Sequence, residues 1–314
     1  MREARVIPFD RARRAAREEP PVEPTPSRPD APAAPTGLRQ SLANVLGFAR
    51  RRLTGDYQVD RFGFDPELTE AVLLPPLRPI YRNWFRVEVS GAEHIPARGG
   101  ALIVSNHSGT LPLDALMTAV AVHDNRPGRH LRMLGADLVF QIPLLSALAR
   151  KSGHTLACMS DAEHLLRAGE LVGVWPEGFK GIGKPFADRY KLQRFGRGGF
   201  VAAALRSGVP IIPCSVVGAE EIYPKIADSR TLARLLGLPY FPVTPFFPLL
   251  GPLGAIPLPT KWHIRFGEPI PVDEYGRDAA EDPMLVFTVT DEVRETIQQT
   301  LYRLLDQRGN PFLG

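Results

Sequence analysis

The chain has 314 residues, of which 44% are hydrophobic and 23% are charged, so it can bury the core of one large domain or of two small ones. Its formal net charge of +4 gives a slight preference for anionic partners and does not indicate nucleic-acid binding. The two cysteines, Cys158 and Cys214, lie in apolar segments without metal-ligand spacing, which predicts buried structural thiols in a reduced compartment.

The N-terminal part of the chain divides into two segments. Residues 1–36 combine arginines with a run rich in Pro, Glu and Ala, which predicts a disordered tail, and they lack the apolar stretch of a signal peptide. Residues 37–84 are expected to form a helical segment ahead of the main domain, 85–314. The first helix of this segment ends in three arginines at 50–52, and its amphipathic pattern suits an anionic membrane. A helix packed on the domain with a solvated basic end is the alternative.

The rest of this segment contains a second helix and a stretch of mixed character. Residues 67–74 are predicted to be helical, and Pro75 and Pro76 are predicted to end that helix. Basic and aromatic residues interleave at 78–86, a composition that suits a bilayer interface, although a packing helix is the alternative. Alternating apolar and polar residues at 85–89 then predict a strand.

From Ala101 onward, strand and helix patterns alternate. Strands are expected at 101–105, 131–134, 155–159, 171–175, 209–217 and 262–266. Helices are expected after the first strand and at 144–151, 160–169, 198–206 and 283–307, and residues 160–163 form a capping box that should begin the third of them. The alternation predicts an α/β fold, a largely parallel mixed sheet flanked by helices.

The longest uncharged stretch lies between Arg234 and Lys261. It contains seven prolines, so it cannot keep the hydrogen bonds of a membrane-spanning helix. Its apolar side chains are expected to divide between the core and the surface. Phe246 or Phe247 should be exposed near the mouth of a cleft, where it would contact a membrane.

A first candidate site follows the strand at 101–105. His107 comes directly after this strand, and Asp114 stands at the start of the next helix. In open α/β sheets, ligands bind at the carboxyl ends of the strands. A histidine held there by a carboxylate can act as a general base, because the acid fixes its tautomer and stabilises the imidazolium. A loop histidine with an aspartate that only favours the helix N-terminus is the alternative.

A second candidate site follows the strand at 171–175. Glu177 should lie on the same edge of the sheet as His107, next to Gly178, and Lys180 and Lys184 carry charge that suits a phosphate. Glu177 would hydrogen-bond an acceptor hydroxyl or simply order the loop. The glycine spacing is not that of a P-loop.

Two other chemistries are not supported by the sequence. No Gly-x-Ser-x-Gly motif is present, which argues against a serine hydrolase. The histidines at 107, 123, 130 and 154 lack the close spacing of metal ligands, so no metal site is expected.

Taken together, these motifs and their order resemble the glycerolipid (lysophospholipid) acyltransferase family over roughly residues 85–270. The resemblance implies a glycerol-3-phosphate acyltransferase-like fold. It also implies that His107 deprotonates an acceptor hydroxyl, which attacks the thioester of acyl-CoA or acyl carrier protein, and that Asp114 orients His107. The substrate-binding positions that it implies are Ser108, Gly109, Glu177, Gly178, Lys180 and Lys184.

Two departures from the family pattern concern the acceptor. Six residues separate His107 from Asp114 where four are usual, and this longer form looks like the branch related to mono- and diacylglycerol acyltransferases. Phe179-Lys180 replaces the Thr-Arg pair that suits a phosphorylated acceptor, and lysine lacks the bidentate fork of arginine.

The sequence therefore predicts an O-acyltransferase without a cofactor, peripheral on the cytoplasmic face of the cell membrane. Its expected acceptor is a lysophospholipid such as 1-acylglycerol-3-phosphate, and its expected partners are membrane lipids and the acyl donor, with no nucleic acid. A neutral mono- or diacylglycerol acceptor is the alternative among enzymes. A non-catalytic lipid-binding protein on the same fold is the other alternative, and the presence of both His107 and Asp114 counts against it. The acyl-chain length, the choice of donor and the oligomeric state are not predicted.

Overall fold

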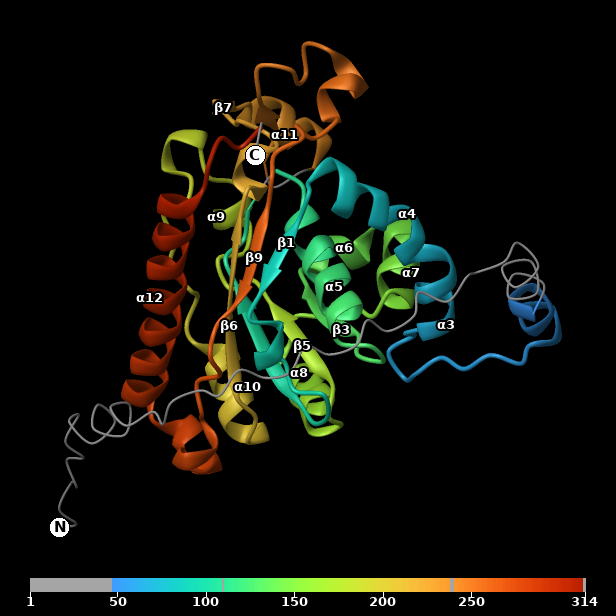
Figure 1. Cartoon of the computed structure of the whole chain (residues 1–314), viewed down its shortest axis with the longest axis vertical. Coiled ribbons are helices and arrows are strands. Elements are labelled where there is room, and N and C mark those ends of the chain that lie inside the picture. The colour runs from blue at the N-terminus through green and yellow to red at the C-terminus, as the bar shows by residue number, and fades with distance from the viewer. Residues whose placement is uncertain (1–46, 109, 238–239, 313–314) are drawn as a thin grey trace, which may run out of the picture. The chain divides into compact units, whose positions relative to one another are not determined.

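The computed structural model describes residues 47–108, 110–237 and 240–312 (Figure 1). All of them belong to one compact unit, Gly47–Gly314. The predicted disordered tail, 1–36, and the first ten residues of the predicted helical segment lie outside the described residues. Residues 47–54 are helical.

A seven-stranded sheet forms the centre of this unit, with the strand order β1-β9-β6-β2-β5-β3-β4. Neighbouring strands are parallel throughout except for the pair β6 and β9, which is antiparallel. The strands are β1 (Glu88–Ser90), β2 (Ala101–Ser105), β3 (Leu131–Gly135), β4 (Thr155–Leu156), β5 (Leu171–Val174), β6 (Ile211–Val217) and β9 (His263–Phe266). A separate two-stranded sheet pairs β7 (Ala227–Asp228) with β8 (Pro242–Val243). The predicted α/β class with a largely parallel mixed sheet is confirmed.

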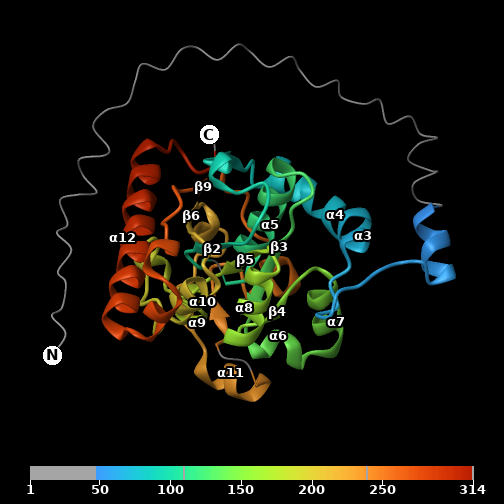
Figure 2. The same ribbon diagram turned by 90° about the horizontal axis from the view of Figure 1, so that it is seen from below.

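Helices cover both faces of the large sheet, and successive residues of β2 contribute to two different cores. Ile103 packs in the core beneath α5 (Leu113–Asn125), together with Met117. Leu102 and Val104 point the other way, because side chains alternate along a strand, and pack with Leu205. This second core lies beneath α8 (Met159–Arg167), α10 (Gly199–Ser207) and α12 (Pro283–Gln307). Figure 2 shows α12 and α5 on opposite sides of the strands.

The remaining elements are short. The α-helices among them are α6 (Asp137–Gln141), α7 (Pro143–Lys151), α9 (Phe179–Ile182) and α11 (Arg230–Leu236). The 3₁₀ helices are Ala92–His94, Phe186–Asp188, Ala219–Glu221, Gly251–Ala255, Asp273–Tyr275 and Arg277–Glu281.

The prediction that Pro75 and Pro76 end a helix is wrong, because the chain stays helical from Pro66 to Trp84. Two α-helical stretches, α3 (Pro66–Leu68) and α4 (Leu74–Pro79), alternate with two π-helical turns, Thr69–Leu73 and Ile80–Trp84. In the π-turns the backbone N–H bonds five residues back, as from Leu74 to Thr69. Pro75 and Pro76 fall in the first turn of α4, where proline is tolerated. The helix continues through the π-helical turns on either side, although the two prolines have no backbone N–H to donate.

Three predicted boundaries are also corrected. The strand expected at 155–159 ends at Leu156, and α8 begins at Met159 without a side-chain cap, so the predicted capping box is wrong. Asp161 instead accepts a hydrogen bond from the Thr155 hydroxyl at 2.9 Å. β1 begins at Glu88 rather than at residue 85, because Arg86 has a positive φ of 45° that a strand does not adopt.

The two cysteines differ in their burial. Cys214 is buried in β6, as predicted, whereas Cys158 is partly exposed, so the prediction of a buried thiol is wrong at that position. Both thiols are free. Within the described part of the chain, no helix has both the length and the apolar character needed to cross a membrane.

Candidate active site

His107 lies two residues after the end of β2, at the carboxyl edge of the sheet. Its predecessor Asn106 is fully buried and clamps this turn to β6: the side-chain amide donates to the carbonyl of Val216 at 3.0 Å and its oxygen accepts from the Val216 N–H at 2.8 Å. Asn106 is not among the site residues predicted from the sequence. An asparagine between a buried strand and a candidate base was the available signal, because a buried amide must find partners.

The side chains of His107 and Asp114 are in contact. Nδ1 of His107 lies 2.7 Å from Oδ2 of Asp114, and the same oxygen accepts a hydrogen bond from the backbone N–H of Ser108 at 2.9 Å. The Asp114 side chain is fully buried, while that of His107 is 13% exposed. A neutral histidine that donates from Nδ1 to a carboxylate carries its free lone pair on Nε2. Asp114 thus contacts the imidazole directly and does more than favour the start of α5.

Glu177 lies on the same edge of the sheet, and both of its carboxylate oxygens bind the protein. Oε1 accepts from the backbone N–H of His107 at 2.9 Å, and Oε2 accepts from the backbone N–H of Gln193 at 2.7 Å. Its side chain is fully buried. This geometry favours the loop-ordering alternative for Glu177 over contact with an acceptor hydroxyl.

Close approach of the two loops depends on Gly181. A Cβ atom at this position would lie 2.8 Å from the carbonyl oxygen of His107, so a larger residue would push the loops apart. Gly178 precedes α9 with a φ of 55°, which turns the chain directly after Glu177.

The two lysines predicted to bind phosphate differ in their surroundings. Lys184 is buried, and its ammonium group lies 3.1 Å from Glu220 and 3.3 Å from Glu177. The charge of Lys184 is therefore already paired within the protein, which counts against its assignment to a phosphate. Lys180 is exposed and takes part in no ion pair within the described part of the chain. Burial raises the pKa of Glu220 to about 7, although Lys184 opposes this shift.

A small pocket lies beside Gly181, the residue that closely approaches the backbone of His107. Its lining includes Thr110, Gly181, Arg189 and Lys225. Lys225 is paired with Asp228 at 2.7 Å, whereas Arg189 is exposed and has no carboxylate partner among the described residues. Arg189 is not among the predicted site residues, because nothing in the sequence indicates that the chain after Lys184 returns to this site.

The remaining predicted positions are Ser108 and Gly109. Ser108 is fully buried, and its hydroxyl has no hydrogen-bond partner in the described structure. Gly109 lies outside the described residues.

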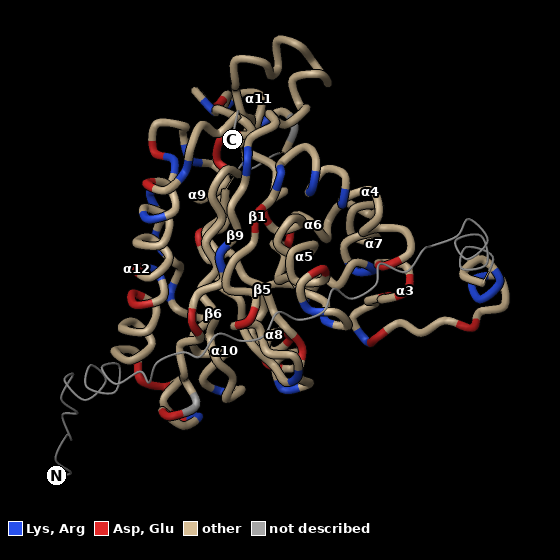
Figure 3. The backbone as a smooth tube through the Cα atoms, in the orientation of Figure 1, with Lys and Arg blue, Asp and Glu red and all other residues tan. Residues whose placement is uncertain are grey.

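The uncharged, proline-rich segment lies at the same end of the molecule as this site (Figure 1). The Tyr240 hydroxyl donates to the carbonyl of Thr110, and burial raises the pKa of Tyr240 to about 12, so the phenol stays protonated. Figure 3 shows no Lys, Arg, Asp or Glu on the looped tube at the top of the view. Phe246 is 41% exposed, as predicted for one phenylalanine of this segment, and Leu249 is 83% exposed.

The basic and aromatic stretch 78–86 contacts the proline-rich segment through two side chains. The Trp84 indole donates to the carbonyl of Pro257 at 2.9 Å, and the Arg86 guanidinium donates to the carbonyl of Pro259 at 3.1 Å. Arg51 and Arg52 differ from these residues, since they pair with Glu67 and Asp65 respectively.

Part of the chain matches a known protein family, and the fold has a counterpart among solved structures. Residues 86–217 match the family model described as Acyltransferase. The crystal structure of the 1-acyl-sn-glycerophosphate (LPA) acyltransferase PlsC from Thermotoga maritima superposes with a TM-score of 0.50 over 86% of this chain and 92% of that one, at 18% identity. This likeness shows a shared fold.

The relatives in sequence include one protein without a described activity and one that is named as an enzyme. An uncharacterized protein of Mycobacterium tuberculosis is 60% identical over 283 residues, which are 90% of this chain and 79% of that protein. The human "DGAT1/2-independent enzyme synthesizing storage lipids" is 29% identical over 196 residues, 60% of this chain and 55% of that protein. The chain belongs to the acyltransferase family.

Proposed function

We propose that this protein transfers a fatty acyl group from an acyl thioester, acyl-CoA or acyl carrier protein, to a hydroxyl of a glycerolipid. The observation that carries the proposal is the 2.7 Å contact between His107 Nδ1 and Asp114 Oδ2 at the carboxyl edge of the sheet. A protein that only binds lipid needs no such pair, so the contact counts against the non-catalytic alternative.

In this reaction Nε2 of His107 takes the proton of the acceptor hydroxyl as its oxygen attacks the thioester carbonyl carbon. Asp114 stabilises the imidazolium that forms and keeps the ring in place. The new C–O bond forms, the C–S bond breaks, and the imidazolium returns the proton to the departing thiolate. The products are the acyl ester and the free thiol, and no cofactor is needed.

A lysophospholipid such as 1-acylglycerol-3-phosphate is the first candidate acceptor. Lys180 and Arg189 are both exposed cations without a carboxylate partner in the described structure, and Arg189 lines the pocket beside Gly181. Cations of this kind suit a phosphate. The structural neighbour is named as an LPA acyltransferase, which supports the same acceptor class.

A neutral acceptor, monoacylglycerol or diacylglycerol, is the second candidate. The burial of Lys184 in ion pairs with Glu177 and Glu220 removes one of the two predicted phosphate ligands. Phe179, which is 43% exposed, stands where a polar residue would suit a phosphorylated acceptor. The name of the human relative, an enzyme synthesizing storage lipids, supports this candidate.

The protein is proposed to act as a peripheral protein on the cytoplasmic face of the cell membrane. The exposed apolar residues of the proline-rich segment would dock on the bilayer, and the basic side chain of Arg86 beside it would face anionic headgroups. A lipid acceptor would then reach His107 without crossing water.

Product analysis tests the proposal. The purified full chain is incubated with labelled acyl-CoA or acyl carrier protein and with lysophosphatidate, other lysophospholipids, monoacylglycerol or diacylglycerol, and the product is identified by mass spectrometry. We expect an acylated lysophospholipid that the His107→Ala variant does not form. Acylation of the neutral lipids alone would select the second candidate, and no product with any combination would contradict acyl transfer to glycerolipids.

A further inference from the structure

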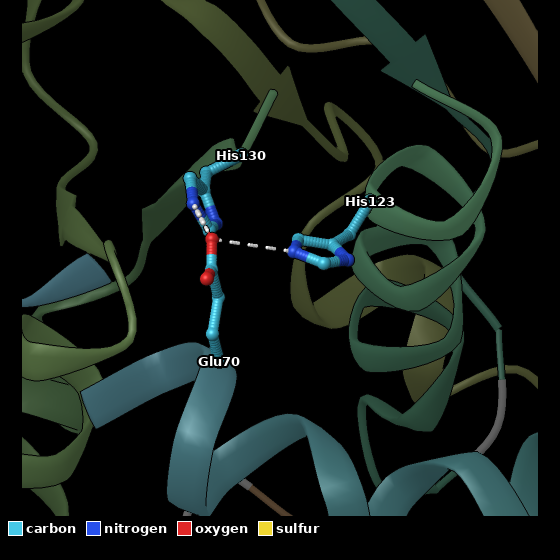
Figure 4. Close-up of side chains that lie close together, drawn as sticks. All are labelled: Glu70, His123 and His130. Atoms are coloured by element: carbon cyan, nitrogen blue, oxygen red, sulfur yellow. Dashed lines mark ion pairs between the residues drawn. The ribbon is translucent and has the colours of Figure 1, made fainter. Parts of the chain in front are cut away.

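Three potential metal ligands from separate parts of the chain meet outside the candidate active site (Figure 4). They are Glu70, His123 and His130, and one ligand atom from each lies within 4.8 Å of the other two. The spacing of the histidines in the sequence predicts no metal site. Glu70 meets His123 and His130 only because the helix 66–84 packs against α5. Their arrangement in space requires a different interpretation.

The separations between the ligand atoms suit a small cation. Oε1 of Glu70 lies 3.1 Å from Nε2 of His130 and 3.5 Å from Nε2 of His123. In a tetrahedral zinc site with bonds of about 2.0–2.1 Å, neighbouring ligand atoms are about 3.3 Å apart. Two of the three separations are thus close to those around a bound ion, and the third, between the two histidine nitrogens, is within 4.8 Å.

The backbone holds the three ligands on ordered elements. Glu70 lies in the π-helical turn Thr69–Leu73, His123 in the last turn of α5, and His130 directly before β3. The histidine side chains are 16% and 15% exposed, while that of Glu70 is 52% exposed. Solvent, and hence a metal ion, can reach the cluster from the glutamate side, and a water molecule can occupy the remaining coordination position.

The electrostatic surroundings also permit a cation. Nδ1 of His123 lies 3.5 Å from Oδ1 of Asp124, the carboxylate partner that metal-bound histidines commonly have. Arg78 lies 3.4 Å from the same nitrogen, but it also binds Asp124 at 2.9 Å and can keep that bond alone.

We propose that Glu70, His123 and His130 bind one Zn²⁺ ion, with water as the fourth ligand. His130 precedes the amino end of β3, whereas His107 follows the carboxyl end of β2, which runs parallel to it. The two sites therefore lie at opposite ends of the strands. The ion would therefore act as a structural link. It would link the helix 66–84 to α5 and to β3 and would take no part in acyl transfer.

A metal-free hydrogen-bond network is the competing explanation. In it, both imidazoles donate from Nε2 to Glu70, and His123 accepts from Arg78 through Nδ1. Glu70→Gln separates the two, because glutamine preserves the size of the side chain and can still accept hydrogen bonds but is a poor zinc ligand. Glu93, an exposed glutamate that forms no ion pair within the described structure, provides the matched control Glu93→Gln.

Calorimetric titration of the untagged full chain with Zn²⁺ after EDTA treatment and dialysis tests the proposal. We expect one saturable site. At a free Zn²⁺ concentration about 100 times the Kd, the melting temperature should rise by about 5 °C. Glu70→Gln and His130→Asn should lose both the site and the zinc-dependent rise, whereas Glu93→Gln and His164→Asn should keep both. His164 is an exposed histidine that contacts Arg61 outside the cluster.

Two results would overturn the proposal. One is the absence of a saturable site in the wild-type chain, and the other is equal zinc binding by wild type and Glu70→Gln. Because each comparison is made with and without zinc on the same variant, a loss of stability caused by the substitution itself does not affect the conclusion. Circular dichroism confirms that each variant is folded.

Discussion

His107 is held through three separate groups of atoms. Asp114 binds its ring at Nδ1, Glu177 binds its backbone N–H, and Asn106 fastens the preceding residue to β6. A base held in this way does not need to reorganise when the substrate binds, and this preorganisation is what an acyl transfer requires of it. His107 and Asp114 are therefore the proposed catalytic pair, while Glu177 and Asn106 position the loop that holds His107.

The first prediction concerns the base. His107→Ala should lower kcat about 10²- to 10⁴-fold because the general base is lost. The fold should be retained, because the backbone N–H of Ser108 still binds the Asp114 carboxylate. Asp114→Asn should also be severely impaired, because an amide cannot stabilise the imidazolium. Initial rates of acyl transfer, with circular dichroism as the folding control, measure both effects. Wild-type turnover by His107→Ala would exclude the proposed mechanism.

The second prediction separates the two lysines. Lys184→Met should lower the free energy of unfolding by roughly 3–5 kcal/mol, because it leaves the buried carboxylates of Glu177 and Glu220 without their cation. Lys180→Ala should leave stability unchanged, since its side chain is exposed, and should raise the KM for a phosphorylated acceptor about tenfold. Urea unfolding and steady-state kinetics measure the two effects. A Lys184→Met protein of normal stability with a raised KM would restore the phosphate assignment of Lys184.

At the level of elements, local sequence patterns predicted most of the large sheet. β2, β5 and β9 fall within a residue or two of their predicted ranges, because short apolar runs between turn residues are typical of buried strands. The helix 66–84 was the main failure. Its π-turns depend on hydrogen bonds shifted by one residue, and no local pattern signals such a shift.

The third prediction concerns the proline-rich segment as a docking element. Leu249 and Phe246 expose apolar surface beside Trp84 and Arg86, on the end of the molecule that carries His107. Phe246→Ser/Leu249→Ser should weaken binding to anionic liposomes roughly tenfold or more, because each apolar side chain that enters the bilayer contributes about 1.5–3 kcal/mol.

Co-sedimentation with phosphatidylglycerol-containing vesicles measures this binding. Phe287→Ser is the matched control, since Phe287 is 61% exposed on α12, far along the chain from the docking segment. Unchanged binding by the double variant would assign docking to other parts of the chain.

At the level of the whole molecule, the sequence indicates which edge of the sheet holds the site, but not how distant segments meet there. His107 and Glu177 could be placed on one edge because parallel strands share their carboxyl ends. The pairing of β9 between β1 and β6, the return of Arg189 to the pocket and the meeting of Glu70 with His123 all depend on tertiary packing. Local periodicity in the sequence carries no information on contacts between distant segments, so these three features could not be predicted from it.

The last prediction concerns a buried ionic cluster that joins distant elements. Lys184 links Glu177, after β5, to Glu220, after β6, and the N–H of Tyr190 donates to Glu220 at 3.0 Å. Burial raises the pKa of Glu220 from 4.5 to about 7. A carboxyl group whose pKa is higher in the folded than in the unfolded chain stabilises the fold fully below pH ~4.5, and this contribution is lost as the pH rises through ~7.

The Glu220→Gln variant should therefore gain stability relative to wild type as the pH rises from 5 to 8, by up to roughly 3 kcal/mol. Urea unfolding at several pH values measures the difference between the two proteins, which cancels the contributions of all other titrating groups. Glu292→Gln, at an exposed position on α12, should follow the wild-type curve throughout. Parallel curves for wild type and Glu220→Gln would show that Glu220 is already ionised in the folded protein at pH 5, with Lys184 offsetting the whole effect of its burial.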